Sequence, residues 1–176
     1  MGGTGLSGAS VLNRTTALLV ALALSTGAAH AHRDRILSLR ADGAIPELPA
    51  PYADTRLRID YSTTSAGRVS QLSFTSGKRS TTVPSCLLAL ISRASPAGLR
   101  LTGSWYHERS SLPHYISVEL RDAEAVQHQA GYTAQRFLFS LEDARLLEVS
   151  TITRLPNDQG EQSQAIPLQG GCPSRV

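Results

Sequence analysis

Alternation of polar and apolar residues is the feature that most restricts what this chain can fold into. In residues 56–62 every second residue is apolar, which is typical of a strand with one buried face. Residues 70–74 repeat the pattern after a stretch that contains Gly67. We expect the two segments to form a hairpin, with a β-bulge near the turn because Val69 is out of phase. The expected pairs are Leu57 with Phe74, Ile59 with Leu72 and Tyr61 with Ser70.

A second hairpin is expected in residues 99–121, which alternate in the same way. If Leu101 lies opposite Leu120, the apolar side chains gather on one face and the polar ones on the other. A slip of one residue would mix the two faces. The same register pairs Gly103 with Val118, Trp105 with Ile116, His107 with His114, Thr102 with Glu119, Ser104 with Ser117 and Tyr106 with Tyr115.

A third hairpin is expected from residues 135–141 and 145–155, joined by the loop 142–144. In that loop Asp143 is the residue that best tolerates a left-handed backbone. The expected core pairs are Phe137 with Val149 and Phe139 with Leu147. The side chains expected on the opposite face are Leu138, Leu146 and Ile152, which indicates a sheet covered on both sides.

Residues 85–93 contain a continuous apolar run whose periodicity does not distinguish a helix from a buried strand. Pro84 before the run, a candidate cap at Ser85 and Pro96 beyond it favour a short helix. Residues 122–133 are expected to form a mobile loop. Together these segments predict a mainly β fold, a single antiparallel β-sandwich or partly closed β-sheet domain of about seven strands with one short helix.

The first 31 residues have the composition of a secretory signal peptide. Arg14 supplies the positive charge, residues 17–24 are apolar, and Ala29-His30-Ala31 provides a small-x-small cleavage pattern. The apolar run is too short to cross a bilayer, so no transmembrane segment is expected after processing. Cleavage after Ala31 would leave a single exported β-rich domain, residues 32–176, in the periplasm or outside the cell; cleavage after Ala29 is the alternative.

The chain has two cysteines, Cys86 and Cys172. In an oxidising compartment we expect them to form one disulfide. The alternative is a reactive or metal-binding thiol pair.

Charge and motifs exclude several classes of function. Without the leader the chain has 16 basic and 14 acidic residues, spread along its length without a basic run. This pattern does not favour nucleic-acid binding. The sequence lacks the glycine-flanked serine of α/β-hydrolases, a Walker loop, a dinucleotide fingerprint and the zinc-protease helix motif. A non-catalytic protein is therefore the favoured interpretation, and a secreted hydrolase with a spatially assembled site is an alternative.

The end of the second hairpin is the densest stretch of chemically capable residues. In the expected register His107 and His114 are close enough to share a metal ion such as copper or zinc, and Glu108 could add an oxygen ligand. The alternative is a polar tip whose rings pack at the sheet rim. The same tip is the candidate binding surface, made up of Trp105, Tyr106, Glu108 and Tyr115; Trp105 is also a candidate core residue.

The mature N-terminus offers a further metal ligand. His32 as the first residue would present an α-amine and an imidazole, a natural chelate for copper(II). Cleavage after Ala29 would instead place histidine first and third. This start, with the nearby Asp42-Gly43, resembles exported copper proteins that begin with histidine, the lytic polysaccharide monooxygenases and the periplasmic copper carriers. The resemblance implies copper binding at His32 and carries over no catalytic residue.

The sequence thus predicts an exported, envelope-associated binding protein whose partner is an unidentified envelope protein or polymer. Its binding surface would be the hairpin tip together with the loop 122–133, because loops on a rigid sheet are where function usually lies. A metal-handling protein that uses His32, His107 and His114 is the alternative.

Overall fold

The computed structural model describes residues 33–62, 68–91, 94, 96–105, 112–121, 131–156 and 160–173. The predicted signal peptide and His32 lie outside these residues. Within them the chain is mainly β, with antiparallel strands in three sheets and one short α-helix, and it forms no closed barrel. The expected fold class is therefore confirmed.

The larger sheet has six strands in the order β1-β5-β6-β7-β8-β9. Consecutive strands from β5 to β9 pair with each other, and β1 pairs with the free edge of β5. The strands are β1 (Arg33–Leu37), β5 (Leu99–Trp105), β6 (Tyr115–Arg121), β7 (Tyr132–Ser140), β8 (Leu146–Arg154) and β9 (Glu161–Ala165).

The second sheet has three strands, β2 (Arg56–Tyr61), β3 (Val69–Ser76) and β4 (Arg79–Thr82). Leu57 pairs with Phe74 and Ile59 pairs with Leu72, as expected from the alternation. The expected bulge is also present, between Asp60 and Tyr61, and it changes the partner of Tyr61 from Ser70 to Val69. Most of the first hairpin could thus be predicted from its pattern.

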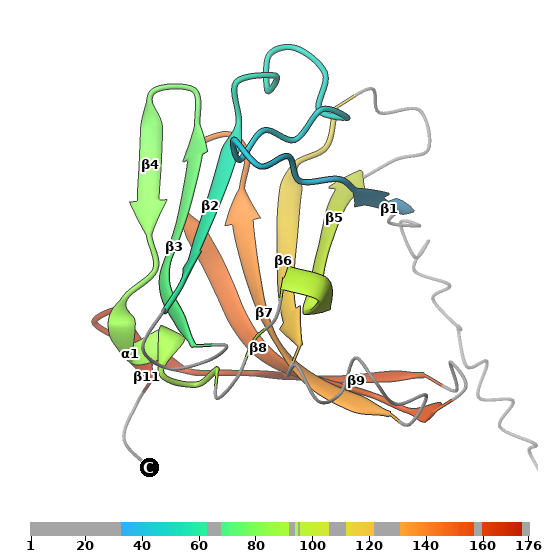
Figure 1. Cartoon of the computed structure of the whole chain (residues 1–176), viewed down its shortest axis with the longest axis vertical. Helices are drawn as coiled ribbons and strands as arrows, with labels where there is room; N and C mark the ends of the chain where they lie inside the picture. Colours follow the sequence, from blue (N-terminus) through green and yellow to red (C-terminus); the bar gives the residue numbers. More distant parts are fainter. Residues whose placement is uncertain are drawn as a thin grey trace, which may run out of the picture.

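The three-stranded sheet packs across one face of the six-stranded sheet, which we call the inner face (Figure 1). Phe74 of β3 stacks on Phe139 of β7, with ring centroids 4.8 Å apart. Side chains of both sheets form one buried core, whose largest fully enclosed members include Phe74, Phe137, Phe139, Leu57, Leu72 and Ile116. Burial of this apolar surface is the main source of stability for such a packing.

The second hairpin has a register two residues away from the expected one. The structure pairs Leu101 with Val118 and Gly103 with Ile116. A shift of two residues keeps every side chain on its expected face, so the period of the pattern cannot detect it. One feature favours the observed register: it places Arg100 opposite Glu119, whereas the expected register would place it opposite Arg121.

The third hairpin contains a bulge that the pattern did not predict. Phe137 pairs with Val149 as expected, but Phe139 pairs with Leu146 instead of Leu147. Because of this bulge Leu146 packs against the core, and the prediction that it faces away from the core was wrong.

The turn of that hairpin also differs from the expectation. The residue with a left-handed backbone is Ala144, at φ 58°, and not Asp143. The Asp143 carboxylate instead accepts a hydrogen bond from the backbone N–H of Arg145 at 3.3 Å. This bond caps the turn and helps to offset the strain at Ala144.

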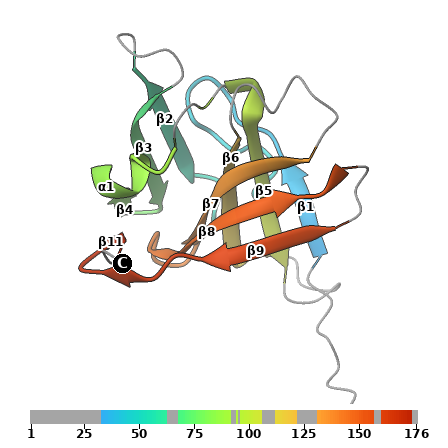
Figure 2. The same ribbon diagram turned by 90° about the horizontal axis from the view of Figure 1, so that it is seen from below.

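A short helix, α1 (Ser85–Leu88), follows the three-stranded sheet, as favoured by the flanking prolines. Pro84 occupies the cap position, so the expected cap at Ser85 was wrong. Cys86 of α1 forms the expected disulfide with Cys172 of the short strand β11 (Cys172–Pro173). β11 pairs with β10 (Leu168–Gln169), and Figure 2 shows this small hairpin beside α1. Among the described residues, no helix has the length and apolar character needed to cross a membrane.

The stretch predicted as a loop at 122–133 ends sooner than expected. Residues 122–130 lie outside the described residues, but Tyr132 and Thr133 belong to β7. Gly131 packs against the end of β8, where a Cβ would lie 2.4 Å from the carbonyl oxygen of Arg154. Only glycine fits this approach, so the entry into β7 is set by backbone packing.

Candidate functional site

The structure describes only part of the predicted hairpin tip. Tyr106, His107 and Glu108 lie outside the described residues. His114 is exposed, and its backbone N–H donates to the carbonyl oxygen of Ser104 at 3.0 Å. In the observed register the strand position opposite His114 belongs to Trp105 and no longer to His107. The register that set the two histidines opposite each other was therefore wrong, and His107 itself lies outside the described residues.

Of the aromatic residues predicted to form the binding surface, the two that the structure describes, Trp105 and Tyr115, differ in burial. Trp105 is 5% exposed and packs in the core, with the Arg35 guanidinium 4.9 Å from its ring centre. Tyr115 is half-buried, 6.3 Å from the His114 ring. Within the described part of the chain, no three His, Cys, Asp or Glu side chains gather in a group that could hold a metal ion.

A different group of polar residues lies on the outer face of the six-stranded sheet, away from the core. Its centre is Glu119 of β6, which is 3% exposed. The strand register sets Arg100 of β5 and Arg136 of β7 on either side of it. We call the whole group the arginine cluster; its members are Arg100, Glu119, Arg121, Tyr132, Arg136, Arg154 and Glu161.

Glu119 is held by donors from three strands. The Tyr132 hydroxyl donates to its Oε1 at 2.9 Å, and Nη2 of Arg154 donates to its Oε2 at 3.4 Å. Arg121 and Arg136 make ion-pair contacts with it at 3.5 and 3.8 Å. A buried carboxylate is costly unless it is paired and hydrogen-bonded, and here both oxygens have partners.

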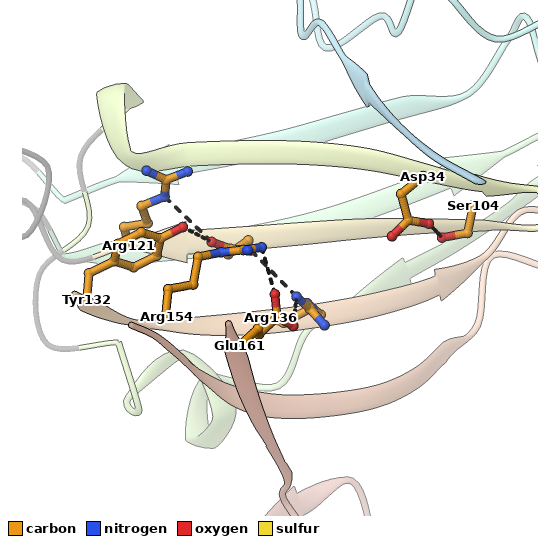
Figure 3. Close-up of polar contacts among 8 residues, drawn as sticks. Asp34, Ser104, Arg121, Tyr132, Arg136, Arg154 and Glu161 are labelled. Carbon is orange, nitrogen blue, oxygen red and sulfur yellow. Dashed lines mark hydrogen bonds and ion pairs between the residues drawn. The ribbon is translucent and has the colours of Figure 1, made fainter. Parts of the chain in front are cut away.

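Glu161 of the edge strand β9 closes the cluster. Its carboxylate lies 2.6 Å from Nη2 of Arg136 and 2.8 Å from Nη2 of Arg154, so it bridges the two guanidinium groups. Figure 3 shows these three side chains converging from neighbouring strands, next to Arg121 and Tyr132. Each arginine is about three-quarters buried, with side-chain exposures of 22–26% for Arg121, Arg136 and Arg154.

The local electrostatics shift two pKa values. Burial, the charge of Glu119 and the hydrogen bond to it raise the pKa of Tyr132 above its ordinary value. For Arg154 burial acts to lower the pKa, but Glu119, Tyr132 and Glu161 together outweigh it and raise the pKa. The Tyr132 ring also lies 4.3 Å from the Arg121 guanidinium, a cation–π contact. At neutral pH Arg154 is therefore charged and Tyr132 is protonated.

The cluster has many more hydrogen-bond donors than acceptors. Four guanidinium groups carry about twenty N–H donors, whereas two carboxylates offer about eight acceptor sites. The imbalance is visible in the structure, since Nε of Arg100, Arg121, Arg136 and Arg154 is buried without a hydrogen-bond partner. Ser150, opposite Arg136 on the same face, also has a buried hydroxyl without a partner. All five atoms are enclosed by the protein itself, so the donors that a ligand could meet are the remaining N–H groups of the guanidinium groups.

A cavity of about 400 Å³ adjoins the cluster on this face. We call it the outer cavity. Its cluster residues are Arg100, Glu119, Arg136, Arg154 and Glu161, and its remaining lining is formed by Asp34, Thr102, Ser104, Ser117, Leu138 and Glu148. Its volume lies within the range of small-molecule sites, but Leu138 is the only apolar residue of its lining, so any ligand would be held by polar and charged groups.

A second cavity of about 780 Å³ lies beside β2. Its lining includes Arg40, Arg58 and Asp60, and the last two form an exposed ion pair at 3.0 Å. Exposed pairs of this kind are solvated and contribute little energy. The described residues show no buried ionic network there, so the outer cavity is the stronger candidate.

Sequence reasoning missed the arginine cluster. Its members come from five segments. Four of these alternate with apolar residues as any half-buried strand does, and the fifth, residues 161–165, is polar apart from Ala165. One signal was available: the opposite charges of Arg100 and Glu119 favour the observed register over the expected one. The placement of β7, β8 and β9 beside them has no comparable local signal.

No family model, curated protein or solved structure matches this chain. The function of the protein is therefore inferred from the chemistry of the outer cavity.

Proposed function

We propose that this protein is an exported, non-catalytic binding protein that holds a small ligand by an acidic group in the outer cavity. The observation that carries the proposal is the donor surplus of the arginine cluster beside a cavity. Guanidinium groups bind carboxylate and phosphate oxygens by strong, often bidentate hydrogen bonds, and these bonds are stronger where water is partly excluded.

Arg100 is the residue best suited to contact the ligand. It lines the outer cavity, and no carboxylate lies within ion-pair distance of it among the described residues. Arg136 and Arg154, by contrast, are already engaged by Glu119 and Glu161. An acidic group placed beside Arg100 gains a partner without displacing an existing ion pair.

Export is supported by the leader-like N-terminal sequence and by the disulfide between Cys86 and Cys172. Disulfides of this structural kind form and persist mainly in oxidising compartments. The envelope or the extracellular space is therefore where we place the binding activity.

The test is calorimetric titration of the exported protein, produced from the full-length chain, with inorganic phosphate, sulfate and acetate. We expect saturable binding of at least one of these anions, weakened about 10- to 100-fold by Arg100→Gln, since a charge-assisted hydrogen bond contributes about 1.5–3 kcal/mol. The matched control is Arg79→Gln, which removes the same charge from exposed β4.

Absence of saturable binding to all three anions would overturn the proposal. So would an equal loss of affinity in Arg100→Gln and Arg79→Gln, because the attraction would then reflect net charge and not a site.

A further inference from the structure

The charges that line the outer cavity divide into a neutralised group and an unpaired group. Glu119 and Glu161 engage Arg136 and Arg154 through the contacts described above. Among the described residues, Arg100 has no carboxylate within ion-pair distance. Glu148 likewise has no basic group within ion-pair distance in this part of the chain. The cavity therefore retains unpaired charge of both signs.

Asp34 adds a second carboxylate that is not paired with a cation in the described structure. Its Oδ1 accepts a hydrogen bond from the Ser104 hydroxyl at 2.6 Å. Figure 3 shows this pair on the same face as the arginine cluster but clearly separated from it along the sheet. Asp34 and Glu148 are both exposed, so their charges are open to a ligand that enters from solvent.

The strand register sets the spacing between the unpaired charges. Arg100 on β5 and Glu148 on β8 are separated by β6 and β7, three strand spacings or about 14–15 Å between backbones. A long arginine side chain and a glutamate side chain that both line one cavity shorten this gap considerably. Thr102 and Ser117, with their hydroxyl groups, and the apolar Leu138 lie between them.

We infer that the ligand is bipolar: its acidic group binds at Arg100, and a primary amine of the same molecule binds at the carboxylate of Glu148. Asp34, on β1, is four strand spacings from Glu148 and is not part of this amine subsite. This inference rests on the proposed function and adds the ligand's second recognition group. A purely anionic ligand would leave the Glu148 carboxylate unpaired and would be repelled by it, whereas an amine pairs with it and donates up to three hydrogen bonds.

The test compares ligands that differ only in the amine. Glycine, γ-aminobutyrate and ε-aminohexanoate are titrated calorimetrically into the exported protein, each against its amine-free partner, acetate, butyrate or hexanoate. We expect at least one amino acid to bind about tenfold more tightly than its partner. The member with the largest preference then measures the separation of the two subsites.

Two variants locate the amine subsite. Glu148→Gln should abolish the preference for the amino acid while leaving the affinity for the amine-free acid unchanged or higher. Glu142→Gln, in the exposed turn after β7, removes the same charge away from the outer cavity and should retain the preference.

The outcomes separate the two proposals. If the simple acids or inorganic phosphate bind but no amino acid is preferred, or if Glu148→Gln keeps the preference, the bipolar ligand is ruled out and the anion site stands. If neither the acids, the amino acids nor phosphate bind, both proposals fall.

Discussion

The two faces of the six-stranded sheet are built from the same strands but are buried in different ways. On the inner face of β6 and β7, side chains such as Val118 and Phe137 are fully enclosed by other apolar groups. On the outer face of β6, Glu119 is almost as deeply buried, but among charged and hydrogen-bonding groups. Burial is therefore not confined to the apolar face of this sheet.

The difference shows where specificity is located. Hydrophobic burial is non-directional and tolerates many arrangements of similar volume. The arginine cluster needs each donor at a set position, because a buried polar group without a partner costs about 1–3 kcal/mol. The inner face accounts for the stability of the fold, whereas the outer face holds side chains with unused hydrogen-bonding capacity beside a cavity.

The largest effect is expected from breaking the inner face. Phe137→Ala removes a fully buried ring and should lower the free energy of unfolding by about 3–5 kcal/mol. Urea unfolding followed by circular dichroism measures it. The control on the outer face, Ser163→Ala, removes an exposed hydroxyl and should change this free energy by less than about 0.5 kcal/mol. A cost below about 1 kcal/mol for Phe137→Ala would contradict the assigned core.

The next effect is expected from the centre of the outer face. Glu119→Gln keeps the side-chain volume but removes the charge that three guanidinium groups contact. We expect a loss of about 2–3 kcal/mol, less than for a fully buried pair because the arginines are partly solvated. Glu161→Gln, at the more exposed edge strand, should cost about 1 kcal/mol. An equal cost for both variants would contradict the central role of Glu119.

A smaller effect is expected from Tyr132, which connects the cluster to the start of β7. Because the pKa of Tyr132 is raised in the folded protein, the unfolded chain loses this proton first as pH rises. Its contribution to stability is therefore present below about pH 10, the ordinary tyrosine pKa, and is lost as pH rises through the folded pKa. Tyr132→Phe should flatten this alkaline loss and cost about 1 kcal/mol at neutral pH.

Urea midpoints between neutral pH and pH values above the ordinary tyrosine pKa measure the difference. Burial also raises the pKa of Tyr61, so Tyr61→Phe provides a comparison on the three-stranded sheet. In the double variant, which carries both substitutions, the urea midpoint should depend less on alkaline pH than in either single variant. If the stability of Tyr132→Phe falls with alkaline pH as steeply as that of the parent protein, the ionisation of Tyr132 is not the cause of the alkaline loss of stability.

Local patterns predicted the strands better than their partners. The alternation in residues 56–62 identified β2, and its pairing with β3 was confirmed apart from the bulge at Tyr61. The same kind of pattern placed the side chains of β5 and β6 on the correct faces but two residues out of register. β1, β4 and β9 were not predicted. In β9, for example, four polar residues are followed by an alanine, so no alternation reveals the strand.

The sequence by itself determined the mainly antiparallel β class, the faces of the longest strands and the disulfide between Cys86 and Cys172. These follow from a period of two residues and from the presence of only two cysteines, both of which are local or countable properties. Only the tertiary structure decided the strand order β1-β5-β6-β7-β8-β9, and with it the arginine cluster. The physical reason is that alternation predicts on which face of the sheet a polar side chain lies. Which charged side chains lie next to it on that face depends on the pairing of strands that are distant in sequence.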